Sequence, residues 1–293
     1  MRYLITGASG FIGRNLVKQL LSTNDDFELL LVQRDLPVFK DKRVTVKLLD
    51  LNEDIISNFK DENFDYIIHL AQSPHFRDFP DYAIDIFNVN TRSVVELANL
   101  GISKGIKGFL YASTGSVYDM NGGILNESSP TNASSFYAAT KIASETLLVP
   151  YSNYFSVDIL RIFNPYGPNQ KGMLLPGLIE RIRNEEAINL NSGKGMVFKP
   201  IFISDLVELI IRFLGIEKKK EYNIYNLGGS EITDIGEISE EIATLLGKEL
   251  RKNVVIDAPV VKLVADSQKL YSKVNYFPVV NWRDGIKNCC YEE

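Results

Sequence analysis

The chain has 293 residues, of which 45% are hydrophobic and 24% charged, enough for one large α/β domain with a buried core and a smaller lobe. The formal net charge is −5 and the basic residues are scattered, so the pattern argues against a nucleic-acid-binding surface, and no apolar run approaches the length of a membrane span. Cys289 and Cys290 are adjacent and no signal peptide is expected, so we expect a reduced, cytoplasmic setting.

The first predicted elements are a strand over Tyr3–Ile5, a glycine-rich turn and a helix. Gly7 permits the tight turn, Gly10 lets the backbone approach a pyrophosphate, and Gly13 lets the helix pack closely against the strand. The amides at the start of such a helix face the phosphates. The turn therefore predicts a dinucleotide-binding loop, made of Gly7, Ser9, Gly10, Phe11, Ile12 and Gly13.

Strand and helix patterns then alternate along the chain. The strands are predicted at residues 28–32, 44–48, 66–70, 109–112 and 157–162. This alternation is typical of an α/β fold, a Rossmann-type doubly wound parallel sheet with right-handed crossovers. After Asn164 glycine and proline cluster, and a helix is expected at residues 178–186. We expect a dinucleotide-binding domain over 1–164, with returns to the sheet at about 201–227, and a smaller C-terminal α/β substrate lobe over 165–293.

The end of the second strand bears on the choice of nicotinamide cofactor. A site for NAD usually places a carboxylate there, which binds the adenine ribose and repels a 2′-phosphate. Gln33 takes that position here and Arg34 follows it, so an amide and a cation could receive the phosphate. NADP(H) is therefore favoured. Asp35 is the competing ribose ligand, which would make NAD(H) the cofactor.

A second group of polar residues follows the strand predicted at 109–112. Ser113 and Thr114 stand at its carboxyl end, where ligands bind in open parallel sheets. Tyr137 and Lys141 are four residues apart in a helical segment, so they share one face. A cation beside a phenol lowers the pKa of the phenol, and a nearby hydroxyl can hold the substrate oxygen. The group predicts a proton-transfer site beside a hydride donor.

These motifs resemble the extended short-chain dehydrogenase/reductases of the NAD(P)-dependent epimerase/dehydratase type, which mostly act on nucleotide sugars. The resemblance extends over nearly the whole chain. It includes Asp50-Leu51, His69-Leu70-Ala71, Asn88-Val89-Asn90, residues 160–168, residues 201–206 and residues 225–228.

The resemblance implies roles for individual residues. Tyr137 would be the general acid/base, Lys141 would bind the nicotinamide ribose, and Thr114 would orient the substrate oxygen, with Ser113 as a neighbour that is either substrate-binding or structural. Asp50 and Leu51 would flank the adenine, and Leu70 and Ala71 would line the cofactor loop. Asn88 is expected to cap its helix and brace the active-site strand. His69 would pack near that loop, and with His75 as the only other histidine no metal site is expected.

The sequence also departs from the family pattern. Sugar 4,6-dehydratases follow the catalytic threonine with Asp-Glu, whereas Gly115 and Ser116 stand here, so dehydration is not expected. The remaining reactions are reduction of a nucleotide 4-keto-sugar, which we favour, and 4-epimerisation through a transient ketone. A non-catalytic NADP-binding regulator is the alternative from another class.

Substrate binding is predicted from the second half of the chain. Asn164 resembles a residue that contacts the nucleotide diphosphate, although a turn-forming Asn-Pro pair would explain it as well. Phe198 stands where an arginine clamp is expected, so Lys199 is the predicted phosphate contact, with Lys171 and Lys262 as alternatives. A sugar or small carbonyl compound without a diphosphate is the competing substrate. The resemblance further implies a homodimer through the helix after Asn88 and the helix that carries Tyr137.

Overall fold

The computed structural model describes residues 1–23, 25–34, 39–119 and 123–291. The chain divides into two compact units that interleave along the sequence. Unit 1 comprises Met1–Asp119, Pro130–Arg161 and Ile211–Tyr225, and unit 2 comprises Met120–Ser129, Ile162–Ile210 and Asn226–Glu293. Each unit is described below by itself.

A seven-stranded sheet forms the centre of unit 1, in the order β12-β7-β5-β4-β1-β2-β3. The strands are β1 (Arg2–Thr6), β2 (Glu28–Gln33), β3 (Val44–Leu48), β4 (Tyr66–His69), β5 (Gly108–Thr114), β7 (Ser156–Ile162) and β12 (Tyr222–Leu227). The pairings from β3 through to β5 are parallel. Strand order reverses beside β1, which pairs with both β2 and β4, and ligands bind at such a switch point in doubly wound sheets. The predicted fold class is confirmed.

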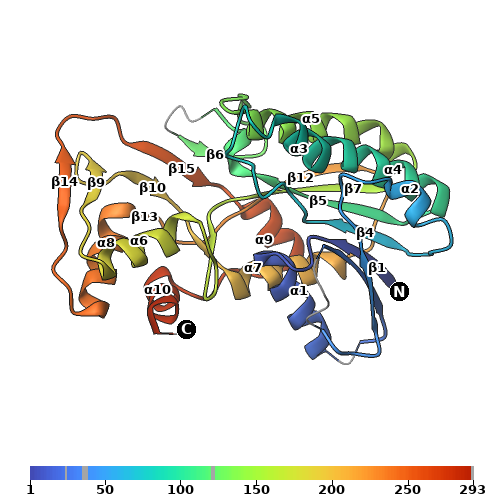
Figure 1. Cartoon of the computed structure of the whole chain (residues 1–293), viewed down its shortest axis with the longest axis horizontal. Helices are drawn as coiled ribbons and strands as arrows, with labels where there is room; N and C mark the ends of the chain where they lie inside the picture. Colours follow the sequence, from blue (N-terminus) through green and yellow to red (C-terminus); the bar gives the residue numbers. More distant parts are fainter. Residues whose placement is uncertain (24, 35–38, 120–122, 292–293) are drawn as a thin grey trace. The chain divides into compact units, whose positions relative to one another are not determined.

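Helices cover both faces of this sheet, which explains why central strands such as β1, β4 and β7 are buried along almost their whole length. α1 (Phe11–Ser22) lies on one face, and α4 (Ser93–Lys104) and α5 (Phe136–Leu148) lie on the other (Figure 1). All of β7 is buried, as expected for a strand covered on both sides. The core between the sheet and its helices includes Leu4, Ile67, Phe109, Ile159, Leu97 and Leu148.

Shorter elements complete unit 1. They are α2 (Ile55–Asn58), α3 (Ala83–Phe87), the π-helix η1 (Asn88–Arg92), and the 3₁₀ helices η2 (Gly115–Val117) and η3 (Val149–Asn153). α3, η1 and α4 follow one another without a break. α5 begins after Ser135, whose hydroxyl accepts from the backbone N of Ala138 at 3.1 Å.

Unit 2 is built from smaller sheets. β13 (Thr233–Asp234), β10 (Met196–Phe198), β15 (Val261–Ala265) and β6 (Ile124–Leu125) form one sheet, while β11 (Ile201–Phe202) pairs with β8 (Pro165–Tyr166) and β14 (Lys252–Val255) pairs with β9 (Ile188–Asn191). Its helices are α6 (Leu174–Arg183), α8 (Ile235–Leu246), α9 (Gln268–Val274) and α10 (Trp282–Tyr291). α7 (Ile203–Leu214) crosses the boundary between the units.

The helix expected at residues 178–186 is shifted towards the N-terminus. α6 begins at Leu174 because Pro176 falls within its first turn, where a proline costs no hydrogen bond. It ends at Arg183 because Glu185 adopts a left-handed conformation with φ of 58°. Among the helices of the described residues, none combines the length and the apolar character needed to cross a membrane.

Candidate active site

The glycine turn after β1 has the geometry of a dinucleotide cradle. Gly7 has a φ of +71°, and a Cβ added there would lie 2.7 Å from the backbone N of Ala71. A Cβ added to Gly13 would lie 2.1 Å from the carbonyl oxygen of Gly7. The N-cap of α1 is Gly10, which has no side chain to cover the first amides of the helix. The residues present therefore fit a pyrophosphate at this turn.

The strand beside the turn holds a buried histidine. His69 Nδ1 lies 2.7 Å from the Thr6 hydroxyl oxygen, and its ring stacks on Tyr111 at 5.7 Å between centroids. Burial, followed by the charge of Lys141, lowers the pKa of His69 to about 3. His69 thus packs near the cofactor loop as expected, in the neutral form. No cluster of metal-ligating side chains occurs among the described residues.

The predicted adenosine-binding residues lie at the ends of β2 and β3. Gln33 is buried at the last position of β2, and Arg34 after it is exposed. Asp35, the competing ribose ligand, lies outside the described residues. The carboxylate of Asp50 accepts from the backbone N of Asn52 at 2.9 Å, and Leu51 is part of the hydrophobic core. Their contacts with a cofactor stay a prediction.

The structure brings Thr114, Tyr137 and Lys141 together. Lys141 is buried, and its Nζ donates to the carbonyl oxygen of Ala112 at 2.8 Å. The same Nζ lies 5.9 Å from the centre of the Tyr137 ring. The Tyr137 hydroxyl donates to Gln72 Oε1 at 3.1 Å. Helix α5 therefore places the phenol and the ammonium at the carboxyl end of β5.

Burial dominates the electrostatics of this pair. It raises the pKa of Tyr137 to about 12, although a hydrogen bond with Thr114 and the charge of Arg77 act to lower it. The Lys141 ammonium donates to the Ala112 carbonyl and is itself buried, and its expected effect on the tyrosine pKa stays a prediction for the cofactor-bound protein. Burial lowers the pKa of Lys141 to about 7, and the nearby Glu145 acts to raise it.

A buried ion pair beneath Lys141 was not predicted from the sequence. The guanidinium of Arg161 contacts both carboxylate oxygens of Glu145, with Nη2 2.6 Å from Oε2 and Nε 3.1 Å from Oε1. Ser113 donates its hydroxyl to the same carboxylate, which favours its structural role over substrate contact. Two signals pointed here: a glutamate four residues after Lys141 on one helix face, and an arginine inside an apolar strand.

The expected role of Asn88 needs correction. It caps no helix N-terminus, because the helical segment already begins at Ala83. The bracing contacts come from Asn90, whose Oδ1 accepts from the backbone N of Ser73 at 2.9 Å and whose Nδ2 donates to the Thr140 hydroxyl at 3.2 Å. Asn88 and Asn90 both lie in the π-helical turn η1, and Asn90 is the one whose side chain contacts α5.

Unit 2 contains the predicted diphosphate contacts. Asn164 has a φ of 42°, and its buried Nδ2 finds no hydrogen-bond partner among the described residues. Phe198 is fully buried, so the residue in the expected place of an arginine packs in the interior. Lys199 follows on the opposite side of the chain and is half-buried. A ligand group could satisfy the Asn164 amide.

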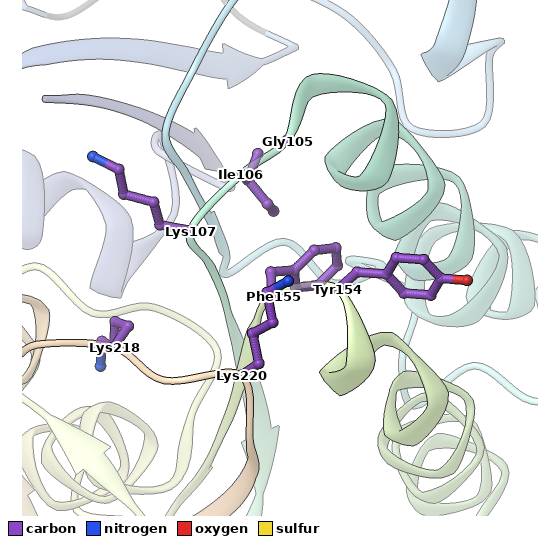
Figure 2. A pocket seen from close by; sticks show the side chains of 7 residues that line it. All are labelled: Gly105, Ile106, Lys107, Tyr154, Phe155, Lys218 and Lys220. Atoms are coloured by element: carbon purple, nitrogen blue, oxygen red, sulfur yellow. The ribbon is translucent and has the colours of Figure 1, made fainter.

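A cavity of about 390 Å³ lies at the other end of the sheet (Figure 2). It is lined by Lys107, Lys218, Lys220, Tyr154 and Phe155, on the segments that lead into β5, β7 and β12. Two of these lysines are balanced by acids: Lys218 lies 3.2 Å from Asp158 and Lys107 lies 3.5 Å from Asp65. The cavity is at the amino ends of the strands and is separate from the candidate site.

The model of the NAD dependent epimerase/dehydratase family matches residues 3–228. The chain belongs to this family. It is 28% identical to Protein CapI of Staphylococcus aureus over 98% of this chain and 96% of that protein. It is also 28% identical to the uncharacterized UDP-glucose epimerase YtcB of Bacillus subtilis, over 98% and 96% of the two chains. The prediction of an enzyme of the extended short-chain dehydrogenase/reductase class is confirmed.

Solved structures of the epimerase/dehydratase family share this fold. UDP-glucuronic acid 4-epimerase from Bacillus cereus in complex with NAD superposes with a TM-score of 0.85 at 24% identity, over 98% of this chain and 94% of that chain. DesIV, a dTDP-glucose 4,6-dehydratase from Streptomyces venezuelae with NAD and TYD bound, gives a TM-score of 0.84 at 25% identity, over 99% and 96%.

Proposed function

We propose that this epimerase/dehydratase family member transfers hydride at C4 of a nucleotide sugar and acts as a 4-epimerase. The observation that carries the proposal is the arrangement of Tyr137 and Lys141 at the end of β5, beside a glycine turn in which a Cβ cannot be accommodated. YtcB, which this chain resembles over its whole length, supports epimerisation. Gly115 and Ser116 offer no acid/base pair for dehydration.

The cofactor we propose is a nicotinamide dinucleotide, held at the glycine turn with its ribose near Lys141. When bound, it supplies the acceptor and donor of hydride. The ionised Tyr137 oxygen takes the proton of the sugar hydroxyl and returns it to the ketone oxygen in the reverse step. Thr114 holds the same sugar oxygen by a hydrogen bond. The positive charge of Lys141 stabilises the tyrosinate.

A second candidate is 4-keto reduction, and Gln33 and Arg34 favour it. An amide and an exposed guanidinium at the end of β2 suit the 2′-phosphate of NADP(H), and a reductase must exchange its cofactor in each turnover. The solved relatives named above carry NAD. Cofactor retention therefore separates the two reactions.

The deciding experiment combines mass spectrometry and product analysis. Protein purified without added nucleotide is analysed for bound cofactor, then incubated with UDP- and dTDP-sugars, and inversion at C4 is followed by NMR. Retained NAD(H) with C4 inversion supports the epimerase. An exchangeable site with NADPH-dependent reduction of 4-keto-sugars supports the reductase. Tight binding of a nicotinamide nucleotide without turnover of any of these sugars would leave the non-catalytic regulator as the remaining candidate.

For the substrate, we propose that Asn164 and Lys199 contact the diphosphate. The unsatisfied Nδ2 of Asn164 supplies a donor, and Lys199 supplies a charge. Lys199→Ala should raise the Michaelis constant for the nucleotide sugar and weaken its salt dependence, with little change in maximal rate, because uniform binding is removed. Equal activity on the free sugar and its nucleotide conjugate would contradict this assignment.

We also propose a homodimer formed through the helices on the outer face of unit 1. α3 and α4 both contact α5 (Figure 1), and the three helices carry large apolar side chains that are exposed. These are Ile84, Phe87, Ile102 and Leu147, with Ile84 74% exposed. An apolar surface of this kind is typical of a face that a partner covers.

A further inference from the structure

Two successive turns of helix α5 form hydrogen bonds with the end of β5. Tyr137, Lys141 and Glu145 are each four residues apart, so they lie on one side of the helix. Lys141 Nζ donates to the Ala112 carbonyl at 2.8 Å, and the next strand residue, Ser113, donates its hydroxyl to Glu145. The residues proposed for catalysis therefore share a strand end and a helix face with a buried carboxylate.

That carboxylate is fully matched by donors. Arg161 reaches both oxygens of Glu145 at 2.6 to 3.2 Å, and the side chains of both residues are almost fully buried. Burial works against the charge of Arg161, but the hydrogen bonds and charge of Glu145 raise its pKa. The guanidinium also lies 4.6 Å above the Tyr118 ring. A buried ion pair is often no more stable than an apolar replacement, so its presence calls for another reason.

The surroundings of Lys141 supply that reason. The centre of the Tyr111 ring, on β5, lies 4.7 Å from the Nζ of Lys141. Burial raises the pKa of this phenol well above its usual range, so it is uncharged. His69 on β4 is neutral at physiological pH because its pKa is lowered to about 3. Tyr137 is also neutral in the protein alone, with a pKa of about 12. Glu145 is the group whose negative charge opposes the effect of burial on Lys141.

We propose that Glu145, clamped by Arg161 and Ser113, is a positioning residue that keeps the buried Lys141 charged and holds it at the end of β5. Glu145 touches neither cofactor nor substrate and acts through Lys141. The inference rests on the proposed function, because the ammonium matters where Tyr137 carries a proton. The reaction would then depend also on the next turn of α5, which carries Glu145, and on β7, which carries Arg161.

The test measures the charge of Lys141 directly, in cofactor-free protein with ¹³Cε-labelled lysine. Lys141 is expected to titrate near pH 7, and Lys141→Met assigns its resonance by removing it. In Glu145→Gln its titration midpoint should fall by about one pH unit or more, because the opposite charge that raises the pKa of Lys141 is removed. Glu145→Asp retains the charge, so its midpoint should stay closer to that of the wild type.

Asp158→Asn provides a matched control. Asp158 lies on the same strand as Arg161 and forms a buried ion pair with Lys218 at 3.2 Å. Its loss should lower thermal stability without moving the midpoint of Lys141. An unchanged Lys141 midpoint in Glu145→Gln, or an equal shift in Asp158→Asn, would overturn the proposal. If Glu145→Gln does not fold, Glu145→Asp is measured in its place. A proton affinity of Lys141 in Glu145→Asp that is more than tenfold below the wild-type value would likewise overturn the proposal.

Turnover gives an independent second reading. Glu145→Gln should lose activity near neutral pH and regain part of it as the pH is lowered, because Lys141 is then protonated again. A purely structural role would produce a loss that does not depend on pH. Since the titration of Lys141 needs neither cofactor nor substrate, inactivity of the wild-type protein on every sugar would count against the proposed function and leave the titration result standing.

Discussion

At the scale of single residues, the candidate site depends on how burial shifts the pKa values of an acidic and a basic side chain. Removal from water disfavours every charged form, so it raises the pKa of Tyr137 to about 12 and lowers that of Lys141 to about 7. The ammonium of a lysine ordinarily has a slightly higher pKa than the phenol of a tyrosine, whereas here the phenol has the higher pKa. Tyr137 is therefore protonated at neutral pH in the protein alone, and the positive charge of a nicotinamide ring bound near the phenol would favour its ionised form.

Tyr137→Phe should abolish turnover while leaving cofactor affinity nearly intact. The phenol oxygen carries the proton, whereas the glycine turn and Lys141 carry binding, and general acid/base assistance is typically worth about a hundred- to ten-thousand-fold. The measurement is kcat on the accepted sugar together with the dissociation constant for the nicotinamide cofactor. More than about a third of wild-type turnover would remove Tyr137 from the mechanism, given that range.

The pair Gln33→Asp and Arg34→Asn should shift cofactor preference towards NAD(H). The new carboxylate would repel a 2′-phosphate and accept from the free ribose, and charge-assisted hydrogen bonds are worth about 1.5–3 kcal/mol each, so the ratio of the dissociation constants should change by at least about tenfold. Titrations with both cofactors measure it. An unchanged ratio would show that the adenine ribose is read elsewhere, for instance by Asp35.

At the scale of elements, the junction between β1 and α1 allows no side chain at Gly7 or Gly13. The helix must start against the preceding turn, and a Cβ at Gly13 would lie 2.1 Å from the Gly7 carbonyl oxygen. The contact is with backbone, so it cannot be relieved by a rotamer change. The packing of the turn against α1 therefore depends on this glycine.

Gly13→Ala should lower both thermal stability and cofactor affinity, the latter by about tenfold or more, because the backbone of the phosphate-binding turn must move. Gly177→Ala is the matched control. Gly177 lies within α6 with open space around its Cα, so alanine there should stabilise the protein by about 0.5–1 kcal/mol. Calorimetry and cofactor titration of both variants check the prediction. Unaltered cofactor affinity in Gly13→Ala would exclude this turn as the phosphate site.

At the scale of the whole molecule, the chain returns twice to each of its two units. Unit 1 takes up residues 211–225 after a long excursion, and unit 2 includes residues 120–129 from early in the chain. Such interleaving means that neither unit is a continuous segment that could be cut out at one point. Within unit 1, helices α3, α4 and α5 carry exposed apolar side chains.

Ile84→Glu combined with Leu147→Glu should convert a dimer to a monomer, because a charge must then be desolvated in an apolar interface. Sedimentation velocity of wild type and variant at matched concentration measures this. Ile256→Glu is the control: Ile256 is 79% exposed in unit 2, and its replacement should leave the dimer intact. A wild-type protein that sediments as a monomer at micromolar concentration would contradict the proposed interface.

The sequence by itself was enough for the Rossmann-type sheet, the glycine turn and the Tyr137–Lys141 pair. These rest on local patterns: apolar runs that alternate with helical periodicity, glycines next to a strand end, and two residues four apart on one helix. Each of these signals lies within a few residues of its consequence. The boundaries of α6 depended on proline and left-handed conformations that the pattern did not resolve.

The surroundings of those residues depend on the tertiary fold. Glu145 meets Arg161 across 16 positions of sequence, and Ser113 joins them from a third segment, so no local pattern could specify the cluster. The same holds for Asn90, which makes the bracing contacts expected of Asn88, because its partners Ser73 and Thr140 lie 17 and 50 positions away in the sequence. Burial, which sets the pKa of Lys141, likewise arises from contacts between distant segments, and that is why the charges of the candidate site had to be read from the fold.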